Sequence, residues 1–264
     1  MPAPIAEFSA AVEGVCCEVR SIFTLDSTDI TLRHWQTLAG AVFEARESCD
    51  GFVISHGTDT LQYSAAALSL MLENLGKPVI FTGAMKPFSA PDSDAADNLS
   101  AAFKAARDSQ SGVWVAFGGK LINGLSCVKV HTSATDAFAD AGKTPPQSGG
   151  AARLRDKLCE KVFYLKITPG TDPDIADFIL EKGYRGVVCE VFGLGGIPKE
   201  LLGRLGELVR SGVRVAAVSA CLYGGADFSV YAAHRQAQEA GLEAWDMTES
   251  AALVRLMLET GEIS

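Results

Sequence analysis

The chain has 264 residues, of which 48% are hydrophobic, and a formal net charge of −9. This length is sufficient for a sizeable core in one large or two modest domains. The acidic balance without basic clusters argues against nucleic acid and anionic membrane surfaces as partners. No apolar run approaches the ~20 residues of a membrane helix, and the N-terminus lacks the basic region of a signal peptide. We therefore expect a soluble, cytoplasmic protein.

The seven cysteines and four histidines do not form a recognisable metal site. No two cysteines have a Cys-x-x-Cys spacing, the histidines lack zinc-protease spacing, and an odd number of thiols fits a reducing compartment. Gly193-Leu194-Gly195-Gly196 is a weak dinucleotide fingerprint because it does not lie at a first strand-to-helix turn. We expect neither a metal nor a cofactor.

In the first half of the chain, predicted strands alternate with predicted helices. Residues 1–18 read as a weakly helical amphipathic segment. We expect strands over 19–25, 51–55, 79–82 and 113–117. We also expect three helices. The first has Trp35, Leu38, Ala39 and Val42 on one face, the second covers 61–75, and the third runs through Asn98, Leu99, Phe103 and Ala106. Such alternation implies right-handed crossovers and a mostly parallel sheet. The Asn-Gly signal within 120–125 then predicts a tight hairpin that returns through 127–130.

The second half predicts a smaller unit of the same kind. Residues 139–158 are small, polar and turn-rich, which is typical of a connection between domains. We expect strands over 162–167, 186–191 and 213–219 and helices over 174–182, 199–210, 230–240 and 248–259. The prediction is an α/β protein with two domains. An N-terminal domain over 1–141 has a mostly parallel sheet flanked by helices, a linker covers 142–160, and a C-terminal parallel α/β domain covers 161–264.

The stretch from Phe52 to Thr60 is the most informative in the chain. An apolar strand stops at Gly57 and a helix begins after Thr60, so Thr58 and Asp59 lie in a strand-to-helix turn. In open α/β sheets ligands bind at these turns, where unpaired N–H groups and the helix dipole favour negative charge. Because parallel strands open at the same edge, Ser27 should lie beside Thr58 and Asp59. The alternative is that Asp59 and the glutamine three residues later form a capping box.

A threonine, an aspartate and a lysine could together move a proton. Hydroxyls are poor nucleophiles unless a neighbouring base activates them. Lys129 could pair with Asp59 if its hairpin folds over the sheet edge, and N–H groups near Gly57 could stabilise an oxyanion. The alternative for Lys129 is an exposed strand lysine. For His56 we favour a packed or hydrogen-bonded strand-end histidine, and for Ser93-Asp94 with Asn98, turn and cap duty.

These motifs occur in an order that resembles the bacterial-type L-asparaginases. The resemblance runs from about Leu25 to the end of the chain, and the His-Gly-Thr-Asp-Thr run is a specific signal in this setting. The segments that carry it are Asp26-Ser27-Thr28-Asp29, His56-Gly57-Thr58-Asp59-Thr60, Thr82-Gly83-Ala84-Met85, Ser93-Asp94-Ala95, Asn98-Leu99, Lys129, Lys166-Ile167-Thr168-Pro169-Gly170, Gly186-Val187-Val188, Phe192-Gly193-Leu194-Gly195 and Asp246-Met247-Thr248.

The resemblance implies an amidohydrolase that converts L-asparagine, or L-glutamine, to the acid and ammonia. Ser27 and Thr28 would hold the α-carboxylate end of the substrate, and Asp59 its α-amino group. Thr58 would be the second catalytic threonine, and Lys129 a base partnered with Asp59. In the family the smaller domain completes the site of a neighbouring subunit, which implies a homodimer or homotetramer.

One family feature is absent from the sequence. The family normally starts with a strand that ends in a Thr-Gly-Gly-Thr loop and supplies the attacking threonine, and nothing before Ser27 matches it. We therefore expect an unpaired sheet edge where that strand would lie. Hydrolysis then uses Thr58 as the nucleophile, or the chain is a non-catalytic relative that binds an amino acid or a partner. A component of a glutamine-dependent amidotransferase is a third reading, which we rank last.

Overall fold

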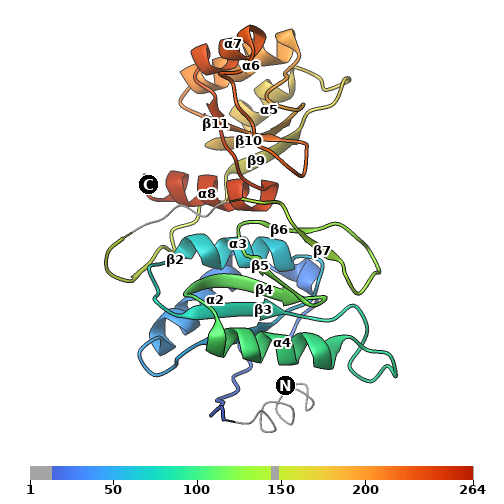
Figure 1. Ribbon diagram of the computed structural model, residues 1–264. Coiled ribbons are helices and arrows are strands. Elements are labelled where there is room, and N and C mark those ends of the chain that lie inside the picture. Colours follow the sequence, from blue (N-terminus) through green and yellow to red (C-terminus); the bar gives the residue numbers. More distant parts are fainter. Residues whose placement is uncertain (1–13, 144–148, 264) are drawn as a thin grey trace. The chain divides into compact units, whose positions relative to one another are not determined.

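The computed structural model describes residues 14–143 and 149–263, and the chain divides into two compact units (Figure 1). The first unit comprises Met1–Ala139 with Gln147–Leu154, and the second comprises Asp140–Pro146 with Arg155–Ser264. The expected two-domain α/β architecture is confirmed. Residues 1–13, the main part of the segment expected to be weakly helical, lie outside the described residues.

The first unit is built on a four-stranded sheet with the order β1-β3-β4-β5. Strands β1 (Phe52–Ser55), β3 (Pro78–Thr82) and β4 (Gly112–Phe117) run parallel, and β5 (Lys120–Asn123) is antiparallel to β4. Helix α4 (Ala95–Asp108) packs on one face of this sheet and α3 (Leu61–Met71) on the opposite face (Figure 1). This places the strand-to-helix turn after β1 at the carboxyl edge of the sheet, as a parallel arrangement requires.

Helix α2 (Leu32–Ala45) packs against α3 and buries the expected face. Its buried side chains recur at helical spacing, and they are Trp35, Leu38, Ala39 and Val42. Helix α3 ends earlier than the predicted residue 75, because its apolar continuation forms β2 (Leu72–Glu73). This short strand pairs antiparallel with β8 (Arg153–Leu154), which lies within the predicted linker.

The hairpin predicted between 120–125 and 127–130 is wrong. Strand β5 instead pairs with β4 through a two-residue turn at Gly118 and Gly119, whose φ angles are +55° and +74°. Two successive positive φ values define the tight turn that suits the strand twist, and glycine adopts them without a steric penalty. Strand β6 (Cys127–Lys129) pairs with β7 (Phe138–Asp140) in a separate two-stranded sheet.

The strand predicted over 19–25 is also absent, since residues 15–26 have no regular secondary structure. The alternation that suggested it is present: Val19, Phe23 and Leu25 are partly buried, whereas Arg20 and Thr24 are exposed. A strand, however, is defined by its hydrogen bonds to a neighbour, and alternating burial alone does not supply one.

Among the described strands, β1 lies at an edge of its sheet. Within the described ranges, only β3 pairs with β1, so the other side of β1 lacks a neighbouring strand there. The apolar residues Phe52, Val53 and Ile54 are only partly buried, whereas every residue of β3 is buried. Among the described residues, the expected unpaired edge is therefore present at the strand that leads into Thr58.

The second unit is a parallel sheet with the order β12-β11-β10-β9. Its strands are β9 (Val162–Lys166), β10 (Gly186–Val191), β11 (Arg214–Ser219) and β12 (Glu243–Ala244), and its helices are α5 (Ile175–Glu181), α6 (Lys199–Arg210), α7 (Ala232–Glu239) and α8 (Glu249–Gly261). Helix α8 covers one face of the sheet, and α5 and α6 pack on the other (Figure 1). A large apolar cluster between these helices and the central strands forms the core.

Lys143, within the predicted linker, is anchored in the second unit. Its side chain is only 5% exposed, and its ammonium group contacts Asp246 Oδ1 at 2.5 Å. It also donates to the carbonyl oxygen of Gly224. A nearly buried ammonium needs such partners, because its desolvation is otherwise unfavourable. This connecting residue is therefore held as part of the C-terminal unit.

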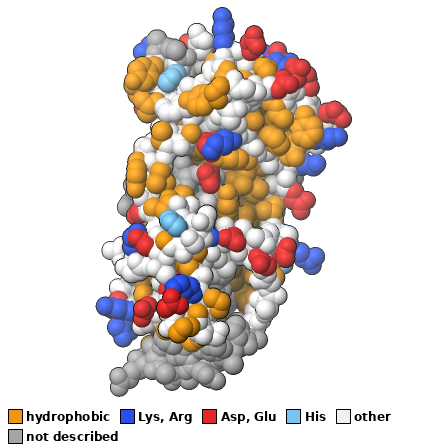
Figure 2. All heavy atoms as spheres, turned by 90° about the vertical axis from the view of Figure 1, so that its right-hand side faces the viewer, with side chains coloured by type: hydrophobic (Ala, Val, Ile, Leu, Met, Phe, Trp, Pro, Cys, Tyr) orange, Lys and Arg blue, Asp and Glu red, His pale blue; other side chains and the backbone are white. Residues whose placement is uncertain are grey.

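Charged side chains of both signs are mixed on the surface that Figure 2 shows. On the face drawn in Figure 2, acidic and basic side chains are interspersed among hydrophobic ones and are not gathered into an extended patch of one sign. None of the helices in the described ranges is both long and apolar enough to cross a bilayer.

Packing in the second unit can be tested with two leucines on neighbouring helices. Leu205 on α6 is fully buried and Leu180 on α5 is 40% exposed. Leu205→Ala should lower the free energy of opening of this unit by roughly 2–5 kcal/mol through lost burial and a residual cavity. The matched Leu180→Ala should change it by about 0.5 kcal/mol or less. Native-state hydrogen exchange at the β10 amides measures both values, and equal losses would contradict this description of the core.

Candidate active site

The structure brings Thr58, Asp59 and Lys129 together. Thr58 and Asp59 lie between the end of β1 and the start of α3, and Lys129 is the last residue of β6. Lys129 Nζ lies 3.0 Å from Thr58 Oγ1 and 2.6 Å from Asp59 Oδ1. The lysine side chain is 16% exposed and the aspartate side chain is 61% exposed. The alternative reading of Lys129 as an exposed strand lysine is therefore wrong.

Ser27 lies beside the turn that carries this cluster, as expected, although the strand that was expected to lead into it is absent. It begins a short 3₁₀ helix, Ser27–Asp29, and its carbonyl oxygen accepts a 2.7 Å hydrogen bond from Thr60 Oγ1. A Cβ atom on Gly57 would lie 2.7 Å from Ser27 Oγ, which is closer than side-chain carbons pack. Glycine at position 57 therefore allows the two turns to touch.

Thr28 is held in the same turn by Asp26. The carboxylate of Asp26 accepts hydrogen bonds from the Thr28 N–H at 2.9 Å and from its hydroxyl at 2.8 Å. These two bonds lower the pKa of Asp26, the backbone bond contributing most. The hydroxyl of Thr28 is thereby oriented by its own turn, and its oxygen retains lone pairs for a ligand.

His56 ends a chain of hydrogen bonds that starts in α2. Trp35 Nε1 donates to Ser64 Oγ at 2.9 Å, Ser64 Oγ lies 2.9 Å from His56 Nε2, and His56 Nδ1 lies 2.6 Å from the carbonyl oxygen of Gly57. An indole can only donate and a carbonyl can only accept, so the chain assigns the histidine proton to Nδ1. Burial lowers the pKa of His56, and the bond to Gly57 partly opposes that shift. The interpretation of His56 as a hydrogen-bonded strand-end histidine agrees with this geometry.

Asp94 and Asn98 organise the loop between β3 and α4. The Asp94 carboxylate accepts the N–H groups of Met85 and Lys86 at 3.0 Å and the Asn98 amide at 3.0 Å. Asn98 also accepts the N–H of Gly118 at 2.9 Å. These bonds organise the loop, as expected of turn residues. The expected cap does not form through Asp94, which is the N-cap residue of α4 but makes no side-chain capping hydrogen bond.

The capping-box alternative for Asp59 is not what forms. The N-cap of α3 is Thr60, which makes no side-chain capping bond. Gln62 instead accepts the backbone N–H of Lys129 at 2.6 Å through its Oε1 atom. Local sequence patterns did not reveal this contact, because a glutamine in a first helical turn is ordinarily read as a local cap and the partner is distant in the chain.

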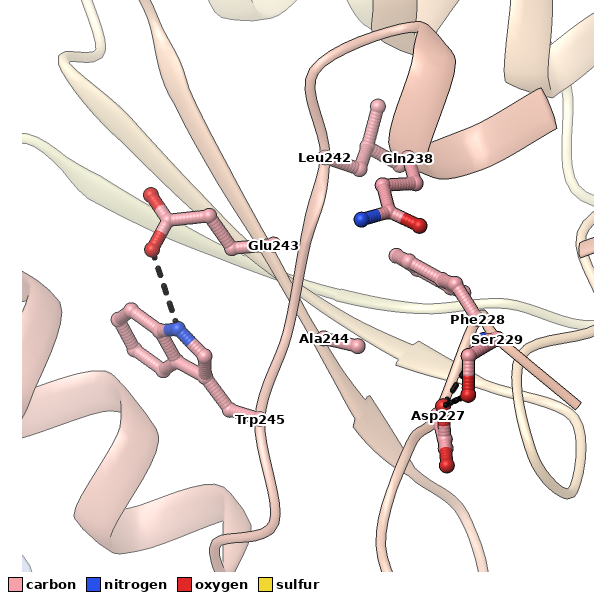
Figure 3. Close-up of a pocket in the computed structure, with 8 residues that line it drawn as sticks. All are labelled: Asp227, Phe228, Ser229, Gln238, Leu242, Glu243, Ala244 and Trp245. Carbon is pink, nitrogen blue, oxygen red and sulfur yellow. Dashed lines mark hydrogen bonds between the residues drawn. The ribbon is translucent and has the colours of Figure 1, made fainter. Parts of the chain in front are cut away.

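A separate cavity of about 370 Å³ lies in the second unit (Figure 3). Its acidic side chains already have partners: Asp227 accepts the N–H and hydroxyl of Ser229, and Glu243 accepts the indole of Trp245. Figure 3 shows Glu243 and Trp245 bonded to each other, with Gln238 and Phe228 elsewhere around the cavity. The residues that line this cavity belong to the second unit, whereas the Thr58 cluster belongs to the first.

Two family models together match nearly the whole chain. The one described as "Asparaginase, N-terminal" matches residues 3–155. The one described as "Glutaminase/Asparaginase C-terminal domain" matches residues 161–262.

Curated relatives of two kinds are similar to the chain. An L-asparaginase from Thermococcus kodakarensis is 38% identical over 94% of this chain and 81% of its own length. One component of the glutamyl-tRNA(Gln) amidotransferase from Pyrococcus abyssi is 36% identical over 91% of this chain, but the match spans only 61% of that component.

Solved asparaginase structures share the fold. The thermostable L-asparaginase from Thermococcus kodakarensis matches with a TM-score of 0.90 at 36% identity, covering 98% of this chain and 84% of that one. L-asparaginase I from Vibrio cholerae matches with a TM-score of 0.79 at 29% identity, covering 91% of this chain and 78% of that one. The probable cytoplasmic L-asparaginase from Campylobacter jejuni matches with a TM-score of 0.76 at 28% identity, covering 90% and 82%.

The lowered pKa of His56 predicts a pH dependence of stability. Since its pKa falls below 6.5 in the folded chain, the unfolded chain binds the proton more readily. The neutral histidine thus contributes stability that is present above about pH 6.5 and lost as the pH falls through the folded pKa. His56→Gln should flatten this part of the curve, whereas His131→Gln, on an exposed residue, should keep it. Urea unfolding between about pH 7.5 and 5.5 measures the slope, and an unchanged slope in His56→Gln would contradict the assignment.

Proposed function

Because the chain belongs to the asparaginase family, we propose that it is an amidohydrolase that hydrolyses the side-chain amide of L-asparagine to L-aspartate and ammonia. The observation that carries the proposal is the pair of hydrogen bonds from Lys129 Nζ to Thr58 Oγ1 at 3.0 Å and to Asp59 Oδ1 at 2.6 Å. An amine that contacts both a hydroxyl and a carboxylate supplies the parts that an activated nucleophile requires.

In the proposed reaction Thr58 supplies the attacking oxygen. Lys129 first releases its ammonium proton to water. Its neutral amine then takes the hydroxyl proton of Thr58 as Oγ1 bonds to the carbonyl carbon of the substrate amide. The proton then moves to the departing nitrogen, the C–N bond breaks, and ammonia leaves. Water hydrolyses the resulting ester, releases aspartate and returns the proton to Thr58. Asp59 stabilises the lysine whenever it is protonated, and we assign the stabilisation of the oxyanion to N–H groups near Gly57.

The substrate's α-amino acid end is assigned to the neighbouring turn. The Asp59 side chain is 61% exposed, so it can also bind an ammonium group of the ligand. Ser27, which adjoins Gly57, and Thr28 are assigned to the α-carboxylate. Placing both charged ends of the ligand beside Thr58 would orient the side-chain amide toward its oxygen. We further propose that the protein acts in the cytoplasm as a homodimer or homotetramer.

A second candidate function is ammonia release from glutamine within an amidotransferase. It is favoured by the amidotransferase relatives, of which those from three Pyrococcus species are between 35% and 37% identical to this chain. The same Thr58 cluster would perform the hydrolysis, but the ammonia would pass to another substrate. A preference for glutamine over asparagine would distinguish this reading from the first.

Ammonia release tests the proposal directly. Thr58→Ala and Lys129→Met should each lower the rate of ammonia release from asparagine by roughly 10³-fold or more, because the nucleophile or its base is lost. Thr58→Ser should retain part of the rate. The matched control is Lys120→Met, which removes a lysine of β5 that forms an ion pair with Asp136 and should leave the rate unchanged.

Calorimetry with aspartate separates catalysis from binding. If the unaltered chain binds aspartate but releases ammonia from neither amide above background, the proposed hydrolysis is wrong and the chain is a non-catalytic amino-acid-binding relative. The same assays on a version extended at its N-terminus by a strand ending in Thr-Gly-Gly-Thr would show whether an added hydroxyl raises the rate.

A further inference from the structure

The backbone N–H of Lys129 requires a partner that its own sheet does not provide. Strand β6 pairs with β7, and the next residue, Val130, donates its N–H to Ala137 at 2.8 Å. Successive N–H groups along an extended chain point to opposite sides, so the N–H of Lys129 is directed away from β7. Gln62 Oε1 accepts it at 2.6 Å.

Gln62 is well suited to hold this group. It is the second residue of α3 and only 6% exposed, although glutamine is ordinarily a surface residue. A buried amide in a packed helix has few rotamers available, so the position of its oxygen is fixed by the helix. The backbone of Lys129 is thereby fixed relative to α3.

Three contacts to Lys129 then come from one five-residue segment. Thr58 and Asp59 bind its ammonium group, and Gln62 binds its backbone. A lysine side chain has many rotamers, and the distance from Nζ to the hydroxyl depends on where its backbone lies. Fixing both ends of the side chain from the same helix start removes that freedom.

We propose that Gln62 is a positioning residue for Lys129, which keeps the lysine Nζ within hydrogen-bond distance of Thr58 Oγ1 and Asp59 Oδ1. The inference deepens the proposed function, on which its kinetic consequence rests. In this role Gln62 acts through the backbone of Lys129.

The first test does not depend on activity. The labelling rate of Lys129 by an amine-reactive N-hydroxysuccinimide ester, followed by mass spectrometry, reports how firmly the amine is held. Gln62→Leu removes the acceptor at similar size and should make this labelling severalfold faster. Gln62→Glu retains an acceptor for the N–H and should restore slow labelling. Gln236→Leu, at an exposed position on α7, is the matched control and should leave the rate unchanged.

The second test reads the same variants by kinetics. A displaced lysine should lower kcat for ammonia release by roughly 10- to 100-fold, since small misplacements of a catalytic group have effects of that size. KM should stay nearly constant, because the proposed ligand contacts are assigned to Ser27, Thr28 and Asp59, and none is assigned to Gln62. Gln62→Glu should recover most of kcat.

The outcomes separate this inference from the proposed function. Unchanged Lys129 labelling in Gln62→Leu, or labelling in Gln62→Glu as fast as in Gln62→Leu, would overturn the inference. A lower kcat together with a higher KM and no rescue would also overturn it, since that combination indicates only a structural role. Faster labelling in a chain that releases no ammonia would support the positioning role while removing the proposed reaction.

Discussion

The ammonium group of Lys129 is the constraint around which the first unit is arranged. Its side chain is 16% exposed, and a cation so largely withdrawn from water is unfavourable unless oxygen atoms replace its hydration. Thr58 and Asp59 supply those atoms, and both lie in one strand-to-helix turn. The contact therefore joins two parts of the chain that are about 70 residues apart in sequence, and it gives the turn the charges on which the proposed chemistry depends.

The residues around this contact each limit one degree of freedom. Gln62 holds the backbone of the lysine, and the chain from Trp35 through Ser64 to His56 holds the carbonyl of Gly57. The absence of a side chain at Gly57 lets Ser27 approach. Polar networks of this kind are rigid when every member has a partner, because each unpaired group would be costly. The turn thus presents its hydroxyl and carboxylate in a defined arrangement before any ligand binds.

Much of this arrangement could be predicted from local patterns, and the failures share a physical cause, which is pairing between distant segments. Helical spacing located Trp35 and Val42 on the buried face of α2, and the abrupt stop at Gly57 located the turn with Thr58. The same patterns misplaced the end of α3, because Leu72 pairs with a strand some 80 residues further on.

Pairing between distant segments also explains why local sequence patterns failed to predict the β4–β5 hairpin and the contact of Gln62. Gly118-Gly119 and Asn123-Gly124 are both credible tight turns, and only the partner strand decides which of them closes a hairpin. The contact of Gln62 with Lys129 has no local signature at all, since most of the sheet separates the two residues in sequence. Side-chain chemistry suggested Thr58, Asp59 and Lys129 as one set, the family resemblance favoured that interpretation, and the structure brings the three residues into contact through Lys129 Nζ.

The side of β1 that no described strand covers has a consequence for how this chain could associate with other polypeptides. A strand whose N–H and C=O groups lack a neighbouring strand can form backbone hydrogen bonds with an extended polypeptide of suitable length. Phe52 and Ile54 are partly buried and, two residues apart in the strand, point to the same face of the sheet, so an added strand would cover more apolar surface on that face. If the edge is open in solution, two molecules could pair through it, and because both contribute the same edge the product would be a closed dimer.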